Sequence, residues 1–401
     1  MSKYCYQGKM FTGSEFEDHA AVVFDNETGL IEAAGPANEV DKPKGATDLS
    51  VPGSTILPGL VDAHLHLFGA RKFDAMEFLS TPTTTSALRS VKDLRNMLDA
   101  GFTAIRDLGS KAGTFLRKAV EEGTIPGPTI ITSGKSLAQT GGDDDLTRLP
   151  LNVSKQLSYS LYCDGIDGCR KAVRLVARSG ANVIKVYASG SLDQAMEEET
   201  KITRQFSVEE LKVIVEEAHA MNLKVASHAY FPEAMTNALD AGADSIEHGV
   251  GLTDEVASRI AKQGVFYVPT ASVYEPFLPR LKPEQREMLL RHVKDEILLA
   301  AKHGVKIAMG TDFAGTDQFP HGQNYREIVL LSKVLGNKAS LEATTKTGSA
   351  CLGLKNSGEI KSGMQANLVI VNGEPSRNIE SLNPEKVQTV IQAGTIRKSR
   401  N

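Results

Sequence analysis

The segment NMLDAGFTAIRD (96–107) joins a helix-like stretch to a short apolar stretch through Gly101. Glycine or asparagine suits the left-handed residue that ends many helices, and a short apolar run after it is typical of a buried parallel strand. The pattern recurs in LVARSGANVIKVY (175–187), AHAMNLKVASH (218–228), ALDAGADSIEH (238–248), RIAKQGVFYVP (259–269) and LAAKHGVKIAMGTD (299–312). The chain is therefore predicted to alternate helices with buried strands.

Eight strands are expected in the middle of the chain, and a helix-like stretch separates each pair. They are placed at residues 60–66, 103–107, 128–133, 183–188, 224–228, 244–248, 265–269 and 306–312. Eight alternating units predict an α/β fold of the (β/α)8 TIM-barrel type. An open doubly wound sheet is the alternative, which the lack of a GxGxxG motif after the first strand disfavours. In the helix expected at 207–221, Ser207 and Glu210 have the spacing of a capping box.

The two ends of the chain have a different pattern. AAVVFDNETGLIEAAGP (20–36) predicts two strands joined by a turn at residues 26–29. GEIKSGMQANLVIVNG (358–373) and VQTVIQAGTIRK (387–398) are again strand-like with glycine turns. Chain termini commonly lie close together. We therefore expect the segments 1–56 and 358–401 to form one small β-sandwich domain and residues 57–357 to form the barrel.

The composition is that of a globular protein, with 41% hydrophobic and 23% charged residues. A net charge of −4 without a basic block does not indicate a nucleic-acid partner. No signal peptide or membrane span is recognised. The spacing of Cys5, Cys163, Cys169 and Cys351 favours free thiols in a reducing cytoplasm. We expect a cytoplasmic protein that acts on a small-molecule substrate, without a membrane partner; the sequence leaves a homo-oligomer open.

Polar residues follow the apolar strands at their carboxyl ends. LPGLVDAHLHLFG (57–69) places His64 and His66 two residues apart, so both side chains lie on one face of a strand. Later strand ends carry Lys185, His228, His248 and Asp312. In a barrel these ends meet at one mouth. Each residue has a structural alternative: a hydrogen-bonded histidine, a helix-capping aspartate or a lysine that reaches solvent. Their combination favours a shared site, whereas His19, His219, His292, His303 and His321 are expected to be structural.

Four imidazoles and one carboxylate suit zinc or a similar divalent ion. They are too many for a single tetrahedral site that keeps a position for water, and they suit two ions with shared ligands. A buried lysine binds metal only after it loses its proton. Reaction with CO₂ would turn Lys185 into a carbamate whose anionic oxygens can bridge two cations.

The motifs LPGLVDAHLHLF, IKVYASG, SHA, IEHG and GTD, in this order, resemble the amidohydrolase superfamily. The chain resembles most closely the imidazolonepropionase-related branch, which includes Xaa-Pro dipeptidases (prolidases) and carboxypeptidases that act on Xaa-Arg or Xaa-Lys. The resemblance implies that His64 and His66 bind the more buried metal, that carboxylated Lys185 bridges both metals, and that His228 and His248 bind the second. It further implies that Asp312 contacts the buried metal and the bridging water.

This ligand set predicts a binuclear metal-dependent hydrolase, and the resemblance implies that it cleaves an amide bond of a dipeptide or an N-acyl amino acid. Two cations lower the pKa of the bridging water, so that hydroxide attacks the carbonyl. Asp312 accepts the proton of that water and later delivers one to the leaving amine. Tyr230 resembles a tyrosine that donates to the carbonyl or oxyanion, and simple aromatic packing at the barrel mouth is an equal alternative.

One loop departs from the family pattern. Relatives commonly carry Gly-Gly-His where SLAQTGGDDDLTR (136–148) has Asp143, followed by Asp144 and Asp145. We expect a solvated acidic loop, because runs of charge usually face water; a preference for a cationic substrate group is the alternative. A free substrate carboxylate is thereby placed in doubt. Hydrolysis of a lactone, an ester or an organophosphate stays open.

Three further residues have two interpretations each. In the loop 315–325, His321 and Asn324 either contact substrate or cap the next helix. Arg106 is expected to form a structural ion pair with Asp107, with a substrate anion as the alternative. Two other functions compete with the binuclear hydrolase: a mononuclear deaminase, which Lys185 disfavours, and a scaffold without metal, which the complete ligand set disfavours.

Overall fold

The computed structural model describes residues 3–192 and 202–400. Its parallel strands form a three-stranded sheet, β6-β7-β8, and a seven-stranded sheet, β10-β9-β11-β12-β13-β14-β15. Their bounds are β6 Leu60–Leu65, β7 Phe102–Asp107, β8 Thr129–Thr132, β9 Ser136–Ala138, β10 Ser160–Tyr162, β11 Val183–Tyr187, β12 Lys224–Ala229, β13 Ser245–His248, β14 Phe266–Val268 and β15 Lys306–Ile307. The prediction of an α/β fold is confirmed.

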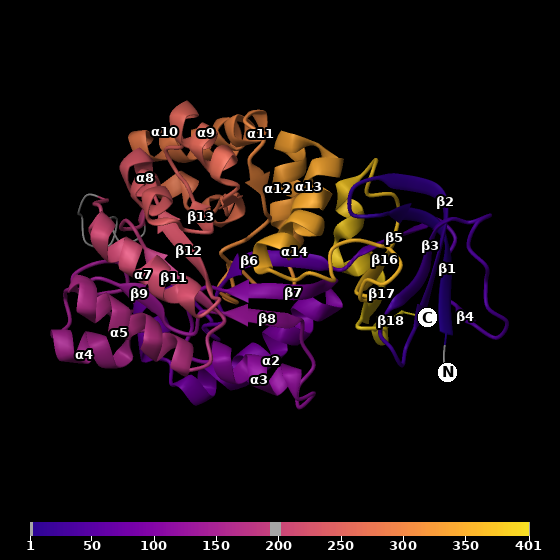
Figure 1. Cartoon of the computed structure of the whole chain (residues 1–401), viewed down its shortest axis with the longest axis horizontal. Coiled ribbons are helices and arrows are strands. Elements are labelled where there is room, and N and C mark those ends of the chain that lie inside the picture. The colour runs from indigo at the N-terminus through magenta and orange to yellow at the C-terminus, as the bar shows by residue number, and fades with distance from the viewer. Residues whose placement is uncertain (1–2, 193–201, 401) are drawn as a thin grey trace.

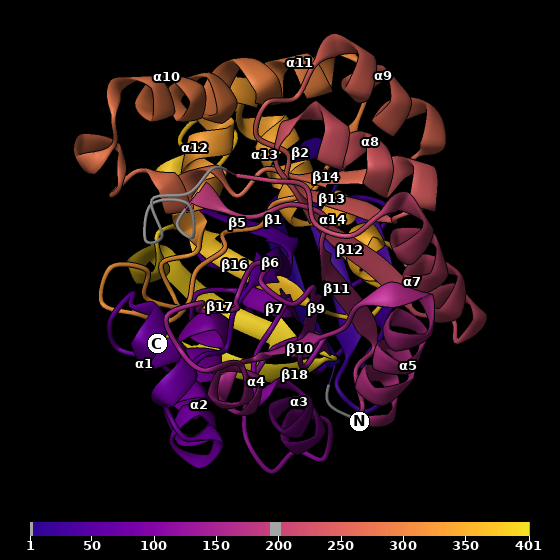
Figure 2. The ribbon, with the colours of Figure 1, turned by 90° about the vertical axis from the view of Figure 1, so that its left-hand side faces the viewer.

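Helices lie around these parallel strands, as Figure 2 shows. The α-helices are α1 Ala75–Ser80, α2 Thr83–Asp99, α3 Gly113–Glu121, α4 Leu151–Leu157, α5 Gly165–Arg178, α7 Val208–Ala220, α8 Phe231–Ala241, α9 Asp254–Gln263, α10 Pro283–Arg291, α11 Ile297–Lys302, α12 Tyr325–Leu335, α13 Asn337–Thr344 and α14 Lys346–Leu352. Among the residues that the structure describes, no helix is both long and apolar enough to cross a membrane.

The residues that end the helices have the predicted conformation. Asn222 follows α7 with φ +57°, and the glycines of the other five repeats also have positive φ values. Ser207 accepts a hydrogen bond from the backbone N–H of Glu210, whose side chain accepts from Ser207 in return, so the predicted capping box is present. These local signals set where each helix stops and the next strand begins.

The predicted strand boundaries are wrong in two places. The last strand was expected at 306–312, but β15 ends at Ile307, because residues 308–312 turn to bond with β6. There the N–H of Ala63 donates to the Met309 carbonyl, at 2.8 Å, and the N–H of Asp312 donates to the His64 carbonyl, at 2.7 Å. The short strands β9 and β10 were not predicted, and they lie between β8 and β11 along the chain.

A backbone hydrogen bond also connects β8, the other edge of the three-stranded sheet, to the start of β11 inside the seven-stranded sheet. The N–H of Asn182, just before β11, donates to the carbonyl of Thr132 in β8, at 3.0 Å. The two sheets therefore contact each other both here and where residues 308–312 meet β6. This arrangement brings the carboxyl ends of strands from distant parts of the sequence to one end of the fold.

The chain ends meet in one eight-stranded sheet, seen on the right in Figure 1. Its strand order is β18-β17-β16-β5-β1-β2-β3, with β4 beside β1. The bounds are β1 Lys3–Phe11, β2 Phe16–Asp25, β3 Ile31–Pro36, β4 Thr47–Asp48, β5 Ser54–Pro58, β16 Leu368–Asn372, β17 Val387–Gln392 and β18 Thr395–Ser399. Residues from both ends, including Phe24, Ile56 and Ile370, share one apolar core. The two flanks therefore fold together.

Candidate metal centre

The six predicted ligands lie on or directly after five strands. They are His64 and His66 at the end of β6, Lys185 on β11, His228 on β12, His248 on β13 and Asp312 after β15. All except His64 line one chamber of about 70 Å³, and His64 places its Nε2 3.5 Å from Oδ1 of Asp312. The ring centroids of His228 and His248 are 4.5 Å apart, and those of His64 and His248 are 4.8 Å apart. The structure thus brings the whole set together.

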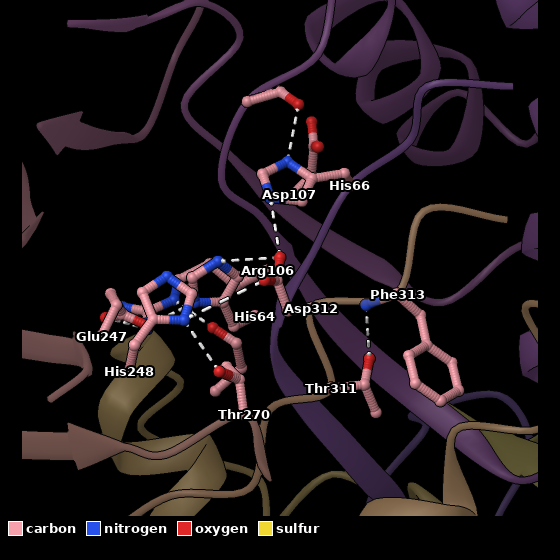
Figure 3. Close-up of polar contacts among 12 residues, drawn as sticks. His64, His66, Arg106, Asp107, Glu247, His248, Thr270, Thr311, Asp312 and Phe313 are labelled. Carbon is pink, nitrogen blue, oxygen red and sulfur yellow. Dashed lines mark hydrogen bonds and ion pairs between the residues drawn. The ribbon is translucent and has the colours of Figure 1, made fainter. Parts of the chain in front are cut away.

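Buried partners fix the orientation of the two β6 histidines. Nδ1 of His64 donates to Oε2 of Glu247, at 2.7 Å, and Nδ1 of His66 donates to the carbonyl of Gly109, at 2.9 Å. The other nitrogen of each ring, Nε2, faces Asp312, as Figure 3 shows, and it carries the lone pair when the ring is neutral. A hydrogen bond to the far nitrogen is the usual way in which proteins orient a metal-binding histidine.

The second pair of histidines is held in the same manner. Nδ1 of His248 shares a hydrogen bond of 2.8 Å with Oγ1 of Thr270. Nε2 of His228 donates to the carbonyl of Gly190, at 3.2 Å. One nitrogen of each ring is thereby satisfied by the protein, and the other remains for a ligand.

Burial controls the charge of these rings. Burial, together with the nearby Lys185, lowers the pKa of His64 and His228 well below the usual value. For His248, burial acts together with the His228 and His64 rings in the same direction. Neutral imidazole is the form that binds a metal. Three of the four histidines are thus kept in the form required of a ligand.

His66 and Asp312 form a contact that requires a cation. Nε2 of His66 lies 3.0 Å from Oδ1 of Asp312. Burial lowers the pKa of His66, but the hydrogen bond and the charge of Asp312 outweigh it, and the pKa is raised. Since Nδ1 already donates to Gly109, two electron pairs face each other across this contact unless a proton or a metal ion lies there.

Three residues of the centre have a left-handed backbone that disfavours side chains other than glycine. His248 has φ +65°, Thr270 has φ +50° and Asp312 has φ +59°. Such conformations cost about 1–3 kcal/mol each and concentrate at functional sites. The strained backbone at these positions orients His248, its hydrogen-bond partner Thr270 and the carboxylate of Asp312 toward one point.

Lys185 is the most unusual residue of the chamber. It is only 1% exposed, so the alternative of a lysine that reaches solvent is wrong. Burial lowers its pKa, because an ammonium is costly to remove from water. Its Nζ lies 5.1 Å from the ring centroid of Tyr187. A lowered pKa favours the neutral, nucleophilic amine, which is the form of lysine that carbamate formation needs.

The donor set fits a divalent metal ion. Ligand atoms of His64, His248 and Asp312 all lie within 4.8 Å of one another. Nε2 of His64 is buried and has no hydrogen-bond partner within residues 3–192 and 202–400. Buried polar atoms are nearly always satisfied, so this unsatisfied nitrogen indicates a group that binds there. Histidine nitrogen and carboxylate oxygen are ordinary ligands of zinc.

A larger cavity of about 280 Å³ adjoins the chamber and shares Asp312 and Tyr230 with it. Most of its walls are apolar or aromatic: Phe73, Phe78, Leu79, Leu146, Tyr159, Leu192, Val273, Tyr274 and Phe277. The cavity is large enough for a small organic molecule next to the histidines.

The expectation of a solvated acidic loop is wrong. Asp143 and Asp145 are each only 5% exposed, and all three aspartates line the large cavity. Asp143 accepts from Ser191, at 2.8 Å, and Asp144 accepts from the hydroxyls of Tyr159 and Ser160. Side-chain donors from elsewhere in the chain thus replace the water that such a charge run usually requires.

The remaining predicted residues have structural roles. His321 shares a hydrogen bond of 3.0 Å with the carbonyl of His66. Asn324 donates to Asp62, at 2.7 Å, and its side chain does not cap α12. Burial raises the pKa of Asp62 to about 6. These hydrogen bonds connect both residues to β6 and the residue that follows it, and the side chain of Asn324 does not cap α12; contact of either residue with substrate stays a prediction.

Arg106 forms the expected structural ion pair, but with a different partner. Its Nη2 lies 2.7 Å from Oε1 of Glu247, and both side chains are buried. Asp107, the predicted partner, accepts instead from Ser110 and Thr132. The result is a chain of contacts from Arg106 through Glu247 to His64, visible in Figure 3. Glu247 was missed, although it directly precedes His248 at a strand end.

Tyr230 lines both the chamber and the large cavity. Its ring stacks on His228, with centroids 4.9 Å apart, and its hydroxyl lies 2.8 Å from that of Tyr274. The ring thus packs against its neighbours, as one interpretation of the sequence expects, and the role of the hydroxyl as a donor to the reacting carbonyl stays a prediction.

Comparison with known proteins identifies the family of the chain. The model of the amidohydrolase family matches residues 55–397. Ochratoxinase from Aspergillus niger is 31% identical over 95% of this chain and 83% of its own length. Its crystal structure has a TM-score of 0.90 and 30% identity, and covers 99% of this chain and 96% of the ochratoxinase chain.

Two other relatives lie in the branch that the motifs indicated. A prolidase crystallised with N-methylphosphonate-L-proline has a TM-score of 0.88 and 29% identity, with 100% of both chains covered. A probable imidazolonepropionase from Xenopus laevis is 23% identical over 88% of this chain and 82% of its own length. The resemblance recognised in the sequence is confirmed: the chain belongs to the amidohydrolase family and is a hydrolytic enzyme.

Proposed function

We propose that the chain is a binuclear metal-dependent hydrolase that cleaves the amide bond of a dipeptide or an N-acyl amino acid. The observation that carries the proposal is the buried chamber in which four histidines, a lysine and an aspartate converge beside a cavity of about 280 Å³. The similarity to ochratoxinase and to a prolidase supports amide hydrolysis. The phosphonate in the prolidase structure is tetrahedral at phosphorus, as a carbonyl carbon becomes when water attacks it.

The ligands divide into two groups. His64, His66 and Asp312 would hold one ion, while His228 and His248 would hold the other, with carboxylated Lys185 shared between them. Zinc suits these nitrogen and oxygen donors. When bound, two such ions supply an acidified water and polarise the scissile carbonyl. The left-handed backbone at His248 and Asp312 supports this assignment, because strain of that kind is retained where a side chain must point in one direction.

Asp312 has the position and the charge of a general base and acid. His64, His66 and Lys185 outweigh the effect of burial and lower its pKa, so that the carboxylate is ionised before reaction. It takes a proton from the attacking water and then delivers it to the nitrogen of the leaving amine as the C–N bond breaks. Tyr230, at the junction of the chamber and the cavity, donates its hydroxyl hydrogen to the oxygen on which negative charge develops.

The aromatic cavity favours a substrate with a large apolar group beside the scissile bond. Hydrolysis of a lactone, an ester or an organophosphate is the alternative, since the same chemistry attacks those bonds. A mononuclear deaminase is disfavoured by Lys185, which lies inside the chamber.

The same proposal includes the architecture. Residues 57–357 are assigned to a (β/α)8 barrel that comprises both parallel sheets, and residues 1–56 and 358–401 to a composite β-sandwich domain. The shared core of the two flanks supports this division. All four cysteines are free, which supports a cytoplasmic location. We propose no nucleic-acid or membrane partner, and we leave a homo-oligomer open.

A panel of dipeptides and N-acyl amino acids tests the function. Release of free amino acid is followed by mass spectrometry for the wild type and for Lys185→Ala. We expect cleavage of substrates with a bulky aromatic or aliphatic residue and none by the variant. If the wild type cleaves lactones or esters but no amide, the amide assignment is wrong.

A further inference from the structure

Tyr274 lies behind Tyr230 as seen from the chamber. Tyr230 lines both hollow spaces, whereas Tyr274 lines only the larger cavity. The two hydroxyl oxygens are 2.8 Å apart and buried. Tyr274 therefore contacts the proposed oxyanion donor without lining the chamber. Its hydroxyl also lies 3.5 Å from Nδ1 of His248, a longer contact than the 2.8 Å hydrogen bond between that nitrogen and Thr270.

The direction of this hydrogen bond follows from the chemistry. If Tyr230 donates its only hydroxyl hydrogen to the substrate oxygen, its own oxygen is left as an acceptor toward Tyr274. A hydroxyl that accepts one hydrogen bond becomes a stronger donor of the next, since bonds in a chain polarise one another. A donating Tyr274 would thus both orient and strengthen the donor at Tyr230.

The backbone around Tyr274 is fixed by a buried acid. Tyr274 ends the short helix η1, Ala271–Tyr274. The N–H groups of Ala271 and Ser272 donate to the carboxylate of Glu327, at 3.0 and 2.6 Å. Glu327 is fully buried on α12. The Tyr274 hydroxyl is therefore held by a rigid segment, as an orienting group must be.

We propose that Tyr274 is a positioning residue, which donates a hydrogen bond to the Tyr230 oxygen and so directs the Tyr230 hydroxyl hydrogen to the reacting carbonyl. The inference rests on the proposed function, because the role of Tyr230 is assigned there. Its distinctive consequence is that Tyr274 affects turnover through Tyr230 and not through its longer contact with His248, whose Nδ1 is already held by Thr270. Removal of the Tyr274 hydroxyl should then have no effect in an enzyme that already lacks the hydroxyl of Tyr230.

The kinetic test is a double-mutant cycle of Tyr230→Phe, Tyr274→Phe and the double variant, on whichever carbonyl substrate the wild type cleaves fastest. We expect Tyr274→Phe to lower kcat about fivefold to twentyfold with KM within about twofold, and the double variant to match Tyr230→Phe. Metal content should equal that of the wild type in all variants. Tyr267→Phe is the matched control, because this buried hydroxyl has no hydrogen-bond partner among the described residues, and its kcat should not change.

Unfolding by guanidinium chloride gives a second readout that needs no substrate. The shift in midpoint of the double variant should be smaller than the sum of the two single shifts, because both single variants remove the same Tyr230–Tyr274 hydrogen bond. The inference is overturned if the kinetic losses of the two substitutions multiply, if Tyr274→Phe changes KM alone, or if the midpoint shifts add. Failure to cleave any amide would instead refute the proposed function, since the cycle can then be measured on a lactone or an ester.

Discussion

Replacing Arg106 by methionine removes one end of the chain of contacts that orients His64. Glu247 then keeps its bonds to Ser245 and His64 but loses the guanidinium that lies 2.7 Å from its Oε1. The exposed fractions of the Arg106 and Glu247 side chains are 2% and 0%, so water cannot replace the guanidinium. Breaking a buried ion pair from one side typically costs about 3–5 kcal/mol, and we expect the free energy of unfolding to fall by this amount.

The chain offers a matched control for this change. Arg95 forms an ion pair with Asp99 one helical turn away in α2, with side chains 47% and 36% exposed. Exposed i,i+4 pairs contribute about 0.3–0.5 kcal/mol. Arg95→Met should therefore lower the free energy of unfolding of the metal-free protein far less than Arg106→Met.

The same chain of contacts also predicts a change in metal affinity. Glu247→Gln should weaken zinc binding about 10–100-fold, as is typical when the hydrogen-bond partner of a metal-binding histidine is lost. Guanidinium unfolding and competition with a chromophoric chelator measure the two effects. If Arg106→Met unfolds within about 1 kcal/mol of the wild type, well short of the cost of an unpaired buried charge, the reasoning is refuted.

Three more substitutions test the centre, and a fourth, Gly168→Ala, serves as the control for Gly310→Ala. Lys185→Ala should lower the metal content, abolish hydrolysis and recover some activity with added acetate; full activity without acetate would exclude the bridging carbamate. Gly310→Ala places a Cβ 2.5 Å from Val268 and 2.8 Å from the Cβ of His64, so kcat should fall about 100-fold through displacement of His64. Gly168→Ala, in open space on α5, should instead add about 0.5–1 kcal/mol to the free energy of unfolding. Asp312→Asn should lower kcat about 10²–10⁴-fold with an unchanged circular-dichroism spectrum, and near-normal turnover would exclude Asp312 as the proton carrier.

Local patterns were sufficient to place most of the strands and their polar ends. Gly242 and Asn222 end their helices, and the next strand begins two or three residues later in each case. These boundaries depend on residues that are close in sequence. The alternation of side chains along β6 likewise puts His64 and His66 on one face. Because the carboxyl ends of parallel strands lie together, the sequence indicated the composition of the chamber.

The partners of these residues could not be predicted, because they depend on contacts between distant segments. Arg106 lies next to Asp107 in sequence, yet it pairs with Glu247, 141 residues away. The short length of β15 has the same origin, since residues 308–312 bond with β6. For Asp143, burial depends on a donor at Ser191, and no local rule reveals that donor.

The metal content of the purified protein tests the central claim most directly. Protein isolated without chelators is analysed by inductively coupled plasma mass spectrometry, then stripped, and activity is followed as zinc is added back. The proposed centre predicts about two divalent ions per chain, no hydrolysis by the stripped protein, and recovery that is complete only with the second equivalent. Full activity with one ion per chain, or with none, would contradict it.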